Sequence, residues 1–292
     1  MKPSFFALGT IFVPVLGCLA IPLASLVSTR LRNLVALLLG FATFILPIFL
    51  IPAVLQSPEG QIVFRYPSIL NLNFILLIDG LSVFVALVSS FIGALIILYS
   101  IDYVAHNEFQ TEYYTMVVMF IGSMMGLVFS GNLIFMYLFW EIAAICSWRL
   151  IGFYRGPSHI VKADKAFLIT FFGAVVMLFG FIQIYSTTGT FDMTAMRTVP
   201  VSSFAVFLIL IGMFSKSATF PLHTWLADAG VAPSTVTSLL HAAVLVKIGV
   251  YAYARLFCYT FNIPAEWNAV IPVLVMFSSF VSAGAAFVEH DI

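Results

Sequence analysis

The stretch KSATFPLHTWLADAGVAPSTVTSLLHAAVLVK, residues 216–247, decides the fold of this chain. A lysine ends an apolar run, two prolines frame a short polar segment, and a second apolar run carries His241 and Lys247. A proline inside a helix removes a backbone hydrogen bond and opens the turn, so Pro221 predicts a helix that breaks just after Lys216. Charged groups inside a membrane are costly, so their presence beside a broken helix points to function.

The composition of the rest of the chain identifies its solvent. The 292 residues are 62% hydrophobic and only 8% charged, with a mean hydropathy of +1.13, and the net charge is zero. So few charges cannot cover a surface that faces water, because soluble domains carry about 25% charged residues. Apolar runs of about 20 residues favour membrane helices over a β-barrel. With no basic cluster in the sequence, we expect no nucleic-acid partner.

We therefore expect an all-α polytopic membrane protein with about nine transmembrane helices, one of them broken. The first run is read as a membrane helix and not as a cleaved signal peptide, because it lacks a small-residue cleavage site. Residues 57–76 read as an external loop with room for a short hairpin. The expected spans cover residues 5–27, 34–55, 81–103, the two runs on either side of 130–132 up to about 153, the run that ends near 185, 203 to the break at 221, 234–258 and 269–288.

Loop charges orient the chain. With the N-terminus outside, five basic residues lie in inner loops and four lie outside, which favours an external N-terminus by a thin margin. The inner set is Arg30, Arg32, Arg155, Lys162 and Lys165, and the outer set is Lys2, Arg65, Arg197 and Arg255.

Neither a metal nor a cofactor is expected from the sequence. Cys18, Cys146 and Cys258 are isolated in or near apolar runs, without the spacing of metal ligands, and are expected to be small buried hydrophobic residues. The Met124-Met125 pair is expected to fill core space.

Four ionisable groups lie deep in apolar sequence: Glu141, Lys216, His241 and Lys247. Burial destabilises a charged lysine, and a nearby carboxylate stabilises it. A lysine held between these two influences can gain or lose its proton after a small change in its surroundings, which is the behaviour of a proton carrier. Hydroxyl groups and freed carbonyls at the break could hold water for proton transfer. Weaker candidates in the polar segment are His223 and Asp228.

Each group also has a structural reading. Glu141 and Lys216 could form a pair that only fixes helix register, His241 could be a core histidine, and Lys247 could extend to the interface. Arg149, near the end of its span, would bind a carbonyl, a lipid headgroup or a partner. The weaker candidates, His223 and Asp228, could cap the broken helix.

Spacing along the last of these helices adds two expectations. Six residues place His241 and Lys247 about 120° apart on a regular helix, so direct contact between them is not expected. Tyr251, four residues beyond Lys247, is expected to share its face.

Four segments together resemble a known family. NLIFMYLFWEIAAICSWRLIGFYR (132–155), KAFLIT (165–170), the stretch 216–256 and LIDGLSVFVALVSSFIGALIILYSIDYV (77–104) are similar to the antiporter-like subunits of respiratory complex I. The same family includes the large subunits of Mrp-type cation/proton antiporters and of membrane-bound, energy-converting hydrogenases. The resemblance covers residues 78–292 and lies closest to the branch of the distal pump and large Mrp subunits.

The resemblance implies a fourteen-helix fold with two inverted five-helix repeats, each forming a half-channel around a broken helix. It divides the chain into N-terminal helices (1–112), one half-channel repeat (113–258) and a C-terminal helix (259–292). It implies that Glu141, Lys216, His241 and Lys247 carry protons, and that the subunit binds no redox cofactor.

The sequence departs from the family pattern in three ways. The family usually continues through five more helices, whereas this sequence stops at Ile292. The rest would lie on another chain, be lost, or be absent from a half-sized subunit, and a chain that supplies the C-terminal half is among the expected partners. Arg149 stands where the family usually has an apolar residue. The sixth helix, KAFLITFFGAVV, lacks the usual charged partner for the central lysine.

The leading hypothesis is a proton- or sodium-translocating antiporter-like subunit of a complex I-related complex, in an inner, energy-transducing membrane. Other membrane subunits and lipid are the expected partners, and electron transfer elsewhere in the complex would be coupled to ion movement. The alternative is a structural or docking subunit that does not conduct. A stand-alone transporter of an organic solute has no supporting constellation in the sequence.

Overall fold

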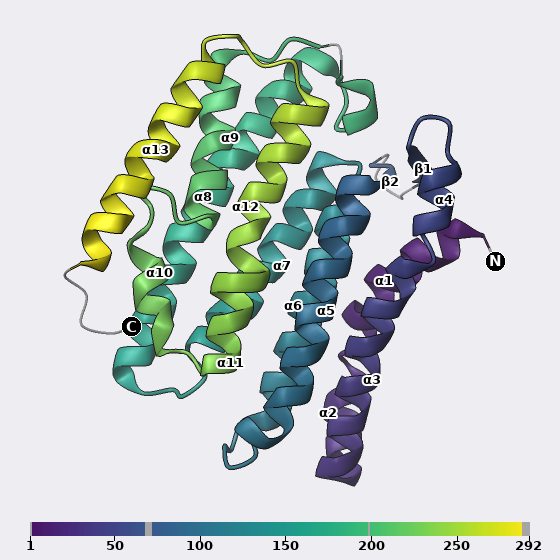
Figure 1. The fold of residues 1–292 in the computed structure, drawn as a ribbon, viewed down its shortest axis with the longest axis vertical. Coiled ribbons are helices and arrows are strands. Elements are labelled where there is room, and N and C mark those ends of the chain that lie inside the picture. The colour runs from purple at the N-terminus through teal and green to yellow at the C-terminus, as the bar shows by residue number, and fades with distance from the viewer. Residues whose placement is uncertain (1, 68–71, 198, 288–292) are drawn as a thin grey trace.

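The computed structural model describes residues 2–67, 72–197 and 199–287, and this part is mainly helical (Figure 1). Seven of its helices are long and apolar enough to cross a membrane. The bent pair α1–α2 adds an eighth crossing, and the shorter apolar helix α9 belongs to the broken span, so the structure is roughly consistent with the expected number of about nine. The elements are α1 (Pro3–Gly17), α2 (Ala20–Val27), α3 (Thr29–Ile48), α4 (Ile51–Gln56), β1 (Gln61–Tyr66), β2 (Phe74–Asp79), α5 (Gly80–Tyr103), α6 (Gln110–Phe129), α7 (Leu133–Ile151), α8 (Pro157–Thr188), η1 (Met193–Ala195), α9 (Ser203–Lys216), α10 (Thr224–Asp228), η2 (Ala229–Val231), α11 (Ser234–Thr237), η3 (Ser238–Ala243), α12 (Leu245–Tyr253), η4 (Ala254–Thr260) and α13 (Trp267–Ala286).

The first span is not the single helix that the sequence predicts. It consists of α1 and α2, which are bent by 48° relative to each other. Pro22 explains the position of the bend, because a proline has no N–H to donate to the carbonyl four residues earlier, which here is that of Cys18. The break falls at Cys18 and Leu19, between the two helices.

The predicted hairpin is present, but it is not only an external loop. Strands β1 and β2 pair antiparallel, with Gln61 opposite Asp79. Strand β2 is buried from Ile75 onward and runs directly into α5. The N–H of Gly131, in the tight turn between α6 and α7, donates to the Ile75 carbonyl at 2.8 Å. The hairpin therefore packs on the helix bundle, apart from residues 68–71, which lie outside the described part.

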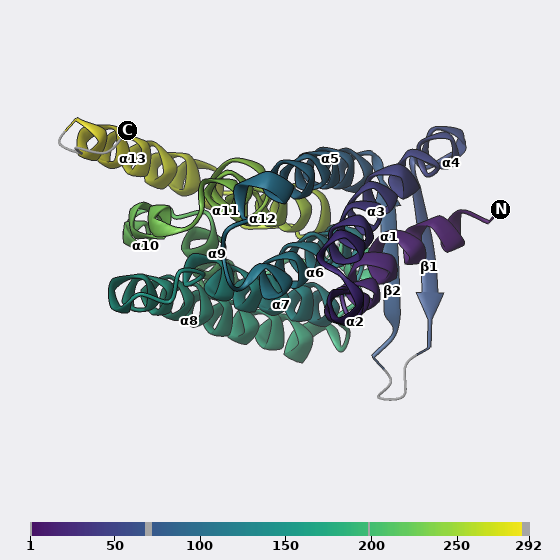
Figure 2. The same cartoon turned by 90° about the horizontal axis from the view of Figure 1, so that it is seen from below.

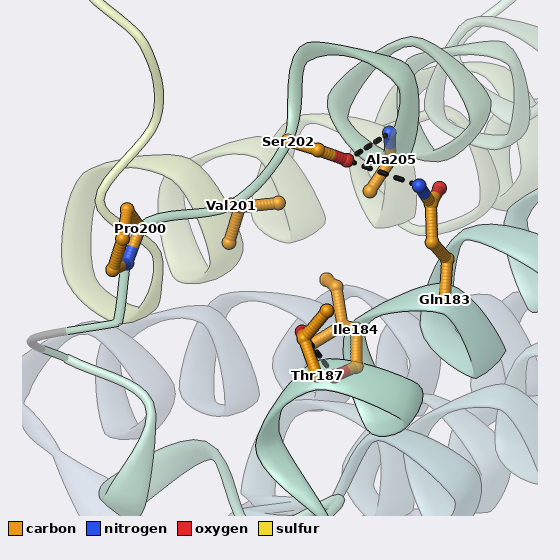
Figure 3. Close-up of a pocket in the computed structure, with 7 residues that line it drawn as sticks. All are labelled: Gln183, Ile184, Thr187, Pro200, Val201, Ser202 and Ala205. Atoms are coloured by element: carbon orange, nitrogen blue, oxygen red, sulfur yellow. Dashed lines mark hydrogen bonds between the residues drawn. The ribbon is translucent and has the colours of Figure 1, made fainter.

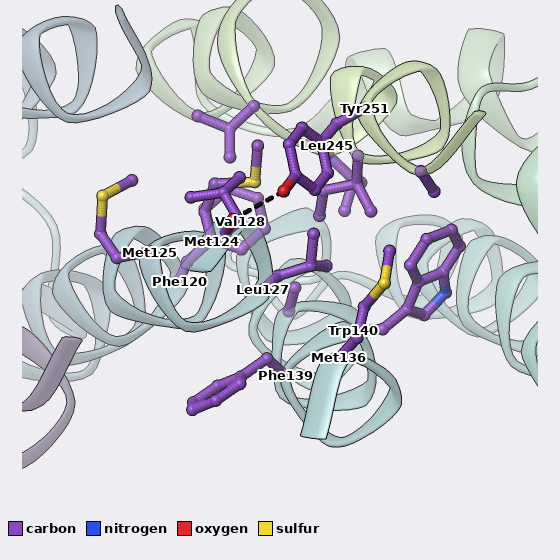
Figure 4. Close-up of a cluster of buried hydrophobic side chains, with 14 of the residues drawn as sticks. Phe120, Met124, Met125, Leu127, Val128, Met136, Phe139, Trp140, Leu245 and Tyr251 are labelled. Carbon is purple, nitrogen blue, oxygen red and sulfur yellow. Dashed lines mark hydrogen bonds between the residues drawn. The ribbon is translucent and has the colours of Figure 1, made fainter. Parts of the chain in front are cut away.

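The core lies where α6, α7 and α12 meet (Figure 4). Met124 and Met125 are fully buried there, which confirms them as packing residues, and Trp140 is buried in the same cluster. Cys18 and Cys146 are buried as expected. The same expectation is wrong for Cys258, which is exposed because it lies on the outward face of η4, at the end of its span.

Two spans differ in detail from the prediction. The sixth helix begins at Pro157, so the sequence RGPSHIVKADK, predicted as a loop, mostly forms the first turns of α8. Proline suits the first helical position, because the N–H that it lacks would have no partner inside the helix. The eighth span runs from Ser234 to Thr260 through two π-helical segments, η3 and η4, and Val244 between η3 and α12 has a non-helical backbone.

The last helix, α13, stands at the edge of the molecule. Seen from below, α13 lies at one end and the hairpin with α1 at the other, with α6 and α7 between them (Figure 2). Only 11% of the most apolar stretch of α13 is buried. The segment that follows α9 contacts it, since the Phe220 N–H donates to the Ser278 hydroxyl. The predicted end of this span at Val288 and the terminal residues lie outside the described residues.

Candidate functional site

Lys216 is the last residue of α9 and is completely buried. Its ammonium nitrogen, Nζ, has no hydrogen-bond partner among the described residues. The indole ring of Trp140 lies beneath it, with its centroid 5.8 Å from Nζ. A buried lysine without a hydrogen bond is energetically costly, so its position at the helix break is unusual for a purely structural residue.

Glu141 lies on α7, next to Trp140, and is half-buried. One of its carboxylate oxygens, Oε1, is buried and has no partner in the described part of the chain. Glu141 and Lys216 are close enough for their charges to interact. They are nevertheless more than 4 Å apart, since no ion pair forms between them. The two predicted residues therefore face one region of the bundle without a direct contact.

The break after Lys216 is held by side chains from other helices. Ala218, two residues after the end of α9, lies in the left-handed region, at φ 53°. The indole N–H of Trp225, on α10, donates to the Ser215 carbonyl at 2.8 Å, and the N–H of Phe220 donates to the Ser278 hydroxyl of α13 at 2.8 Å. Both groups lost their helical partners at the break, so these two bonds satisfy them.

The hydroxyl groups at the break are also engaged with protein. Ser217 donates to the Met213 carbonyl at 2.6 Å and lies 3.2 Å from the Thr219 hydroxyl. The prediction that hydroxyls here hold water is untested, but Ser217 already has a protein partner. The ionisable groups near the break that are buried and have no partner in the described part are Lys216 Nζ, Glu141 Oε1 and His223 Nδ1.

Helix α12 approaches the break closely at Gly249. A Cβ atom there would lie 2.6 Å from the Met213 carbonyl oxygen and 2.9 Å from Ser217 Cβ. Only a glycine fits such an approach. The eighth span, which carries His241 and Lys247, is thus packed directly against the end of α9.

His241 lies in the π-helical segment η3 and is half-buried, and its Nε2 atom has no partner among the described residues. Lys247 is exposed on the surface of the chain, and its Nζ atom lies 3.5 Å from the His241 carbonyl oxygen. The expectation that the two residues are not in direct contact is wrong, because the Lys247 side chain reaches the backbone carbonyl of His241. The 120° separation assumed a regular α-helix, and η3 has a wider turn.

Tyr251 does not share the face of Lys247. It is buried, and its hydroxyl donates to the Val128 carbonyl at 2.6 Å, as Figure 4 shows. Lys247 and Tyr251 are four residues apart, so their directions differ by about 40° on a helix. In this bundle that difference separates an exposed lysine from a buried tyrosine.

The two weaker candidates, His223 and Asp228, do not cap α10. His223 precedes that helix but makes no capping hydrogen bond; its ring packs against Phe220 and its Nδ1 atom is buried without a partner in the described part. Asp228 forms an ion pair with Lys165 of α8 at 2.6 Å. That pair ties α10 to α8 and leaves Asp228 unavailable as a cap.

Arg149 binds the carboxylate of Glu112. A backbone carbonyl was one of the partners expected for it. Its Nε atom donates to Glu112 of α6 at 2.7 Å, and Arg155 binds the other oxygen of the same carboxylate. The sequence did not indicate this pair, because Glu112 and Arg149 lie in different helices.

A buried ion pair was missed altogether. Arg255 donates to both carboxylate oxygens of Asp79 at 2.6 and 2.7 Å, and its Nε atom donates to the Tyr251 hydroxyl at 2.9 Å. Burial by itself would raise the pKa of Asp79, but the hydrogen bonds and charge of Arg255, with those of Ser82, lower it below the ordinary value. The sequence contains a signal for this pair, because Arg255 is a charged residue within the apolar run 234–258. The orientation argument had assigned Arg255 to the outer loops.

One cavity lies away from these groups. It has a volume of about 300 Å³ and lies between the end of α8 and the start of α9, at the end of α9 opposite to Lys216 (Figure 3). Gln183 donates to the Ser202 hydroxyl there at 3.1 Å. Its lining carries no charged side chain, so it offers no obvious site for proton transfer.

Family models match two parts of the chain. Residues 130–292 match the transmembrane family described as "NADH:quinone oxidoreductase/Mrp antiporter, TM", and residues 66–114 match "NADH-Ubiquinone oxidoreductase (complex I), chain 5 N-terminus". The first match alone covers more than half of the chain.

Named relatives point the same way. The chain is 39% identical over 244 residues to the A component of an Na(+)/H(+) antiporter from Alkalihalophilus pseudofirmus, which covers 78% of this chain and 30% of the relative. It is 40% identical over 194 residues to the A1 component of an Na(+)/H(+) antiporter from Staphylococcus aureus, which covers 64% of this chain and 24% of the relative. The chain thus spans a third or less of the length of these relatives.

Two solved complexes have a similar fold. A chain of an archaeal membrane-bound sulfane sulfur reductase superposes with a TM-score of 0.79 at 22% identity, over 91% of this chain and 56% of its own length. A chain of the Mrp complex from Dietzia sp. DQ12-45-1b superposes with a TM-score of 0.73 at 25% identity, over 86% of this chain and 27% of its own length. With the family match over residues 130–292, these findings place this integral membrane protein in the NADH:quinone oxidoreductase/Mrp antiporter family.

Proposed function

We propose that this chain forms one proton-carrying half-channel, over residues 113–258, in a multi-subunit cation/proton antiporter of an energised membrane. The observation that carries the proposal is Lys216, which is completely buried at a helix break and has no hydrogen-bond partner among the described residues. Burial disfavours its ammonium form and Glu141 stabilises it, so small movements at the break can switch its protonation.

The other candidates have roles in sequence. A proton leaves the ammonium of Lys216 and is accepted by the neutral imidazole of His241, whose Nε2 atom is buried and without a partner in the described part. The imidazolium then gives a proton to the amine of Lys247, which restores the histidine. Because Lys247 is exposed on this chain, its proton passes to a group on a neighbouring membrane protein of the complex or to water between the two.

Sodium is the ion that we propose is exchanged for protons. The relatives of 39–40% identity are named as components of Na(+)/H(+) antiporters, and coupling to electron transfer is the alternative. The membrane would be an inner one, such as the cytoplasmic membrane of a bacterium or the energy-transducing membrane of an organelle.

The test uses membrane vesicles that contain the full chain with its copurifying subunits. A pH-sensitive dye reports proton movement after addition of sodium or of an electron donor. The Lys216→Ala variant should abolish the signal while copurification stays normal, and Lys162→Ala, the same change at the start of α8, should leave it intact. A signal that needs an electron donor selects redox coupling over antiport.

Two outcomes would contradict the proposal. Normal proton movement in Lys216→Ala would remove Lys216 from the pathway. The other outcome combines two observations: wild-type vesicles show no proton movement, and the complex fails to assemble when the chain is deleted. Together they would favour the structural or docking role instead.

A further inference from the structure

A second cavity lies where α7 ends and α8 begins. It has a volume of about 240 Å³ and lies at the opposite end of α7 from the tight turn at Gly131. It is lined by Trp148, Arg149, Gly152, Arg155, Ile160 and Ala163.

Two arginines of this cavity share one carboxylate. Arg149 and Arg155 both donate to Glu112, so one positive charge of the two is not neutralised by this acid. Each guanidinium has five N–H donors, and most of these remain available after the bonds to Glu112. The side chains are 34% and 40% exposed, so an approaching anion can reach them.

The remaining groups around the cavity are accounted for as well. Asp164 is the other acid nearby, and one of its oxygens accepts a hydrogen bond from the Trp148 indole at 2.7 Å. Arg149 packs over the Trp148 ring and Arg155 over the Phe109 ring, which fixes the direction of both side chains.

The backbone adds to the positive potential. Helix α8 begins at this cavity with Gly156 as its N-cap residue, and no side chain caps its first N–H groups. Such a helix terminus attracts anions, phosphate groups in particular. The preceding residue, Arg155, has a φ of 54°, which turns the chain sharply from α7 into α8.

The cavity meets a surface suited to hydrocarbon. Leu138 and Ile145 are 48% and 49% exposed on α7. Steps of seven and four residues lead from Leu138 to Ile145 and on to Arg149, so the three form one stripe along the helix. Trp148 lies at the end of this span, where tryptophan is typical of the membrane–water interface. An apolar stripe that ends in a basic cavity matches an acyl chain joined to a phosphate.

We propose that this cavity binds the phosphate diester headgroup of an anionic membrane lipid. Arg149 and Arg155 hold the phosphate oxygens, the N-terminus of α8 adds a favourable potential, and an acyl chain lies along the stripe of Leu138 and Ile145. The site is separate from Lys216 and does not depend on the proposed transport.

The test measures lipid binding to the full chain, purified with its copurifying subunits and depleted of lipid. Phosphatidylglycerol and phosphatidylcholine are added at matched concentrations, and native mass spectrometry counts bound lipid. The double variant Arg149→Gln/Arg155→Gln should weaken phosphatidylglycerol binding at least about tenfold, which corresponds to about 1.4 kcal/mol, because it removes the charged donors to the phosphate.

A second variant separates binding from folding. Glu112→Gln removes the competing carboxylate, so phosphatidylglycerol should bind more tightly than to the wild type. The control is Arg65→Gln, which removes an exposed arginine of the hairpin and should change nothing.

Three results would overturn the proposal. One is equal phosphatidylglycerol binding by the wild type and the double variant. Another is weaker binding in Glu112→Gln. The third is binding of inorganic phosphate without any preference for phosphatidylglycerol over phosphatidylcholine, which would make this a site for a soluble anion.

Discussion

Asp79 and Arg255 are 176 residues apart in the sequence and form a two-pronged, buried ion pair. Asp79 also caps α5, where it accepts a hydrogen bond from the Ser82 N–H at 2.9 Å. Arg255 extends the connection through Tyr251 to the Val128 carbonyl of α6. The pair thus joins the start of α5 and the end of α6 to the span that carries His241 and Lys247.

Removing one partner of this pair should destabilise the protein strongly. Arg255→Met leaves the Asp79 carboxylate buried without its partner, which should cost about 3–5 kcal/mol in the free energy of unfolding. Thermal unfolding in detergent measures the loss. Arg65→Met, in an exposed pair with Asp192, is the matched control and should cost at most about 1 kcal/mol.

The double variant Asp79→Asn/Arg255→Met sharpens this prediction. It removes both charges, so it should be less destabilised than the sum of the two single variants. Additive losses would show that the pair is not coupled.

The same pair should make stability depend on pH at low pH. The pKa of Asp79 is lowered in the folded state, whereas an unfolded aspartate titrates near 3.9. The carboxylate therefore stabilises the fold above about pH 4, and this contribution is lost as the pH falls through the lower, folded pKa. Asp79→Asn should be less stable than the wild type at pH 7, and the difference should narrow below about pH 4.

Unfolding curves from pH 7 to pH 3 test this dependence. A constant difference between Asp79→Asn and the wild type across that range would contradict it. Asp192→Asn removes the charge that pairs with the exposed side chain of Arg65; it serves as the control and should show a small difference throughout.

Trp225 should stabilise the broken helix through one hydrogen bond. Trp225→Phe keeps most of the ring volume but leaves the buried Ser215 carbonyl without its donor, at a cost of about 1–3 kcal/mol. Trp267→Phe is the control, because the indole N–H of Trp267 has no partner among the described residues. Thermal unfolding compares the two, and equal losses would show that the bond to Ser215 contributes nothing.

Gly249→Ala should separate the eighth span from the break. The added Cβ would lie 2.6 Å from the backbone oxygen of Met213, which cannot move without shifting α9. Proton movement in vesicles should fall several-fold at normal expression. Gly284→Ala, in α13, adds a Cβ with nothing within 4 Å and should leave transport unchanged. Full transport in Gly249→Ala would show that close packing at the break is dispensable.

Much of this fold could be predicted, because a membrane forces each backbone to satisfy its own hydrogen bonds. Apolar runs of the right length therefore mark the spans, and the Lys216–Pro221 spacing marks the broken one. The bend at Cys18 was missed because Pro22 lies near the end of a run that is otherwise long enough to be one helix. The start of α8 at Pro157 was missed because polar residues there were read as a loop.

The candidate site was predicted only in part. The sequence locates Glu141, Lys216, His241 and Lys247 in apolar runs, and their roles in proton transfer remain predictions. Their mutual positions depend on how the helices rotate and pack. Two π-helical segments change the direction of side chains along the eighth span, and a regular α-helix does not describe that change.

The sequence by itself determined that this chain lies in a membrane, where it crosses, and that one crossing breaks beside a lysine. These features are local, since hydrophobicity and proline act within a single helix. Only the tertiary structure decided that Lys216 has no hydrogen-bond partner among the described residues, that Arg255 is buried against Asp79, and that Lys247 is exposed. Each of these features depends on contacts between helices that are distant in sequence. The free energy of such a contact depends on how the helices pack, and the sequence of one helix does not determine that packing.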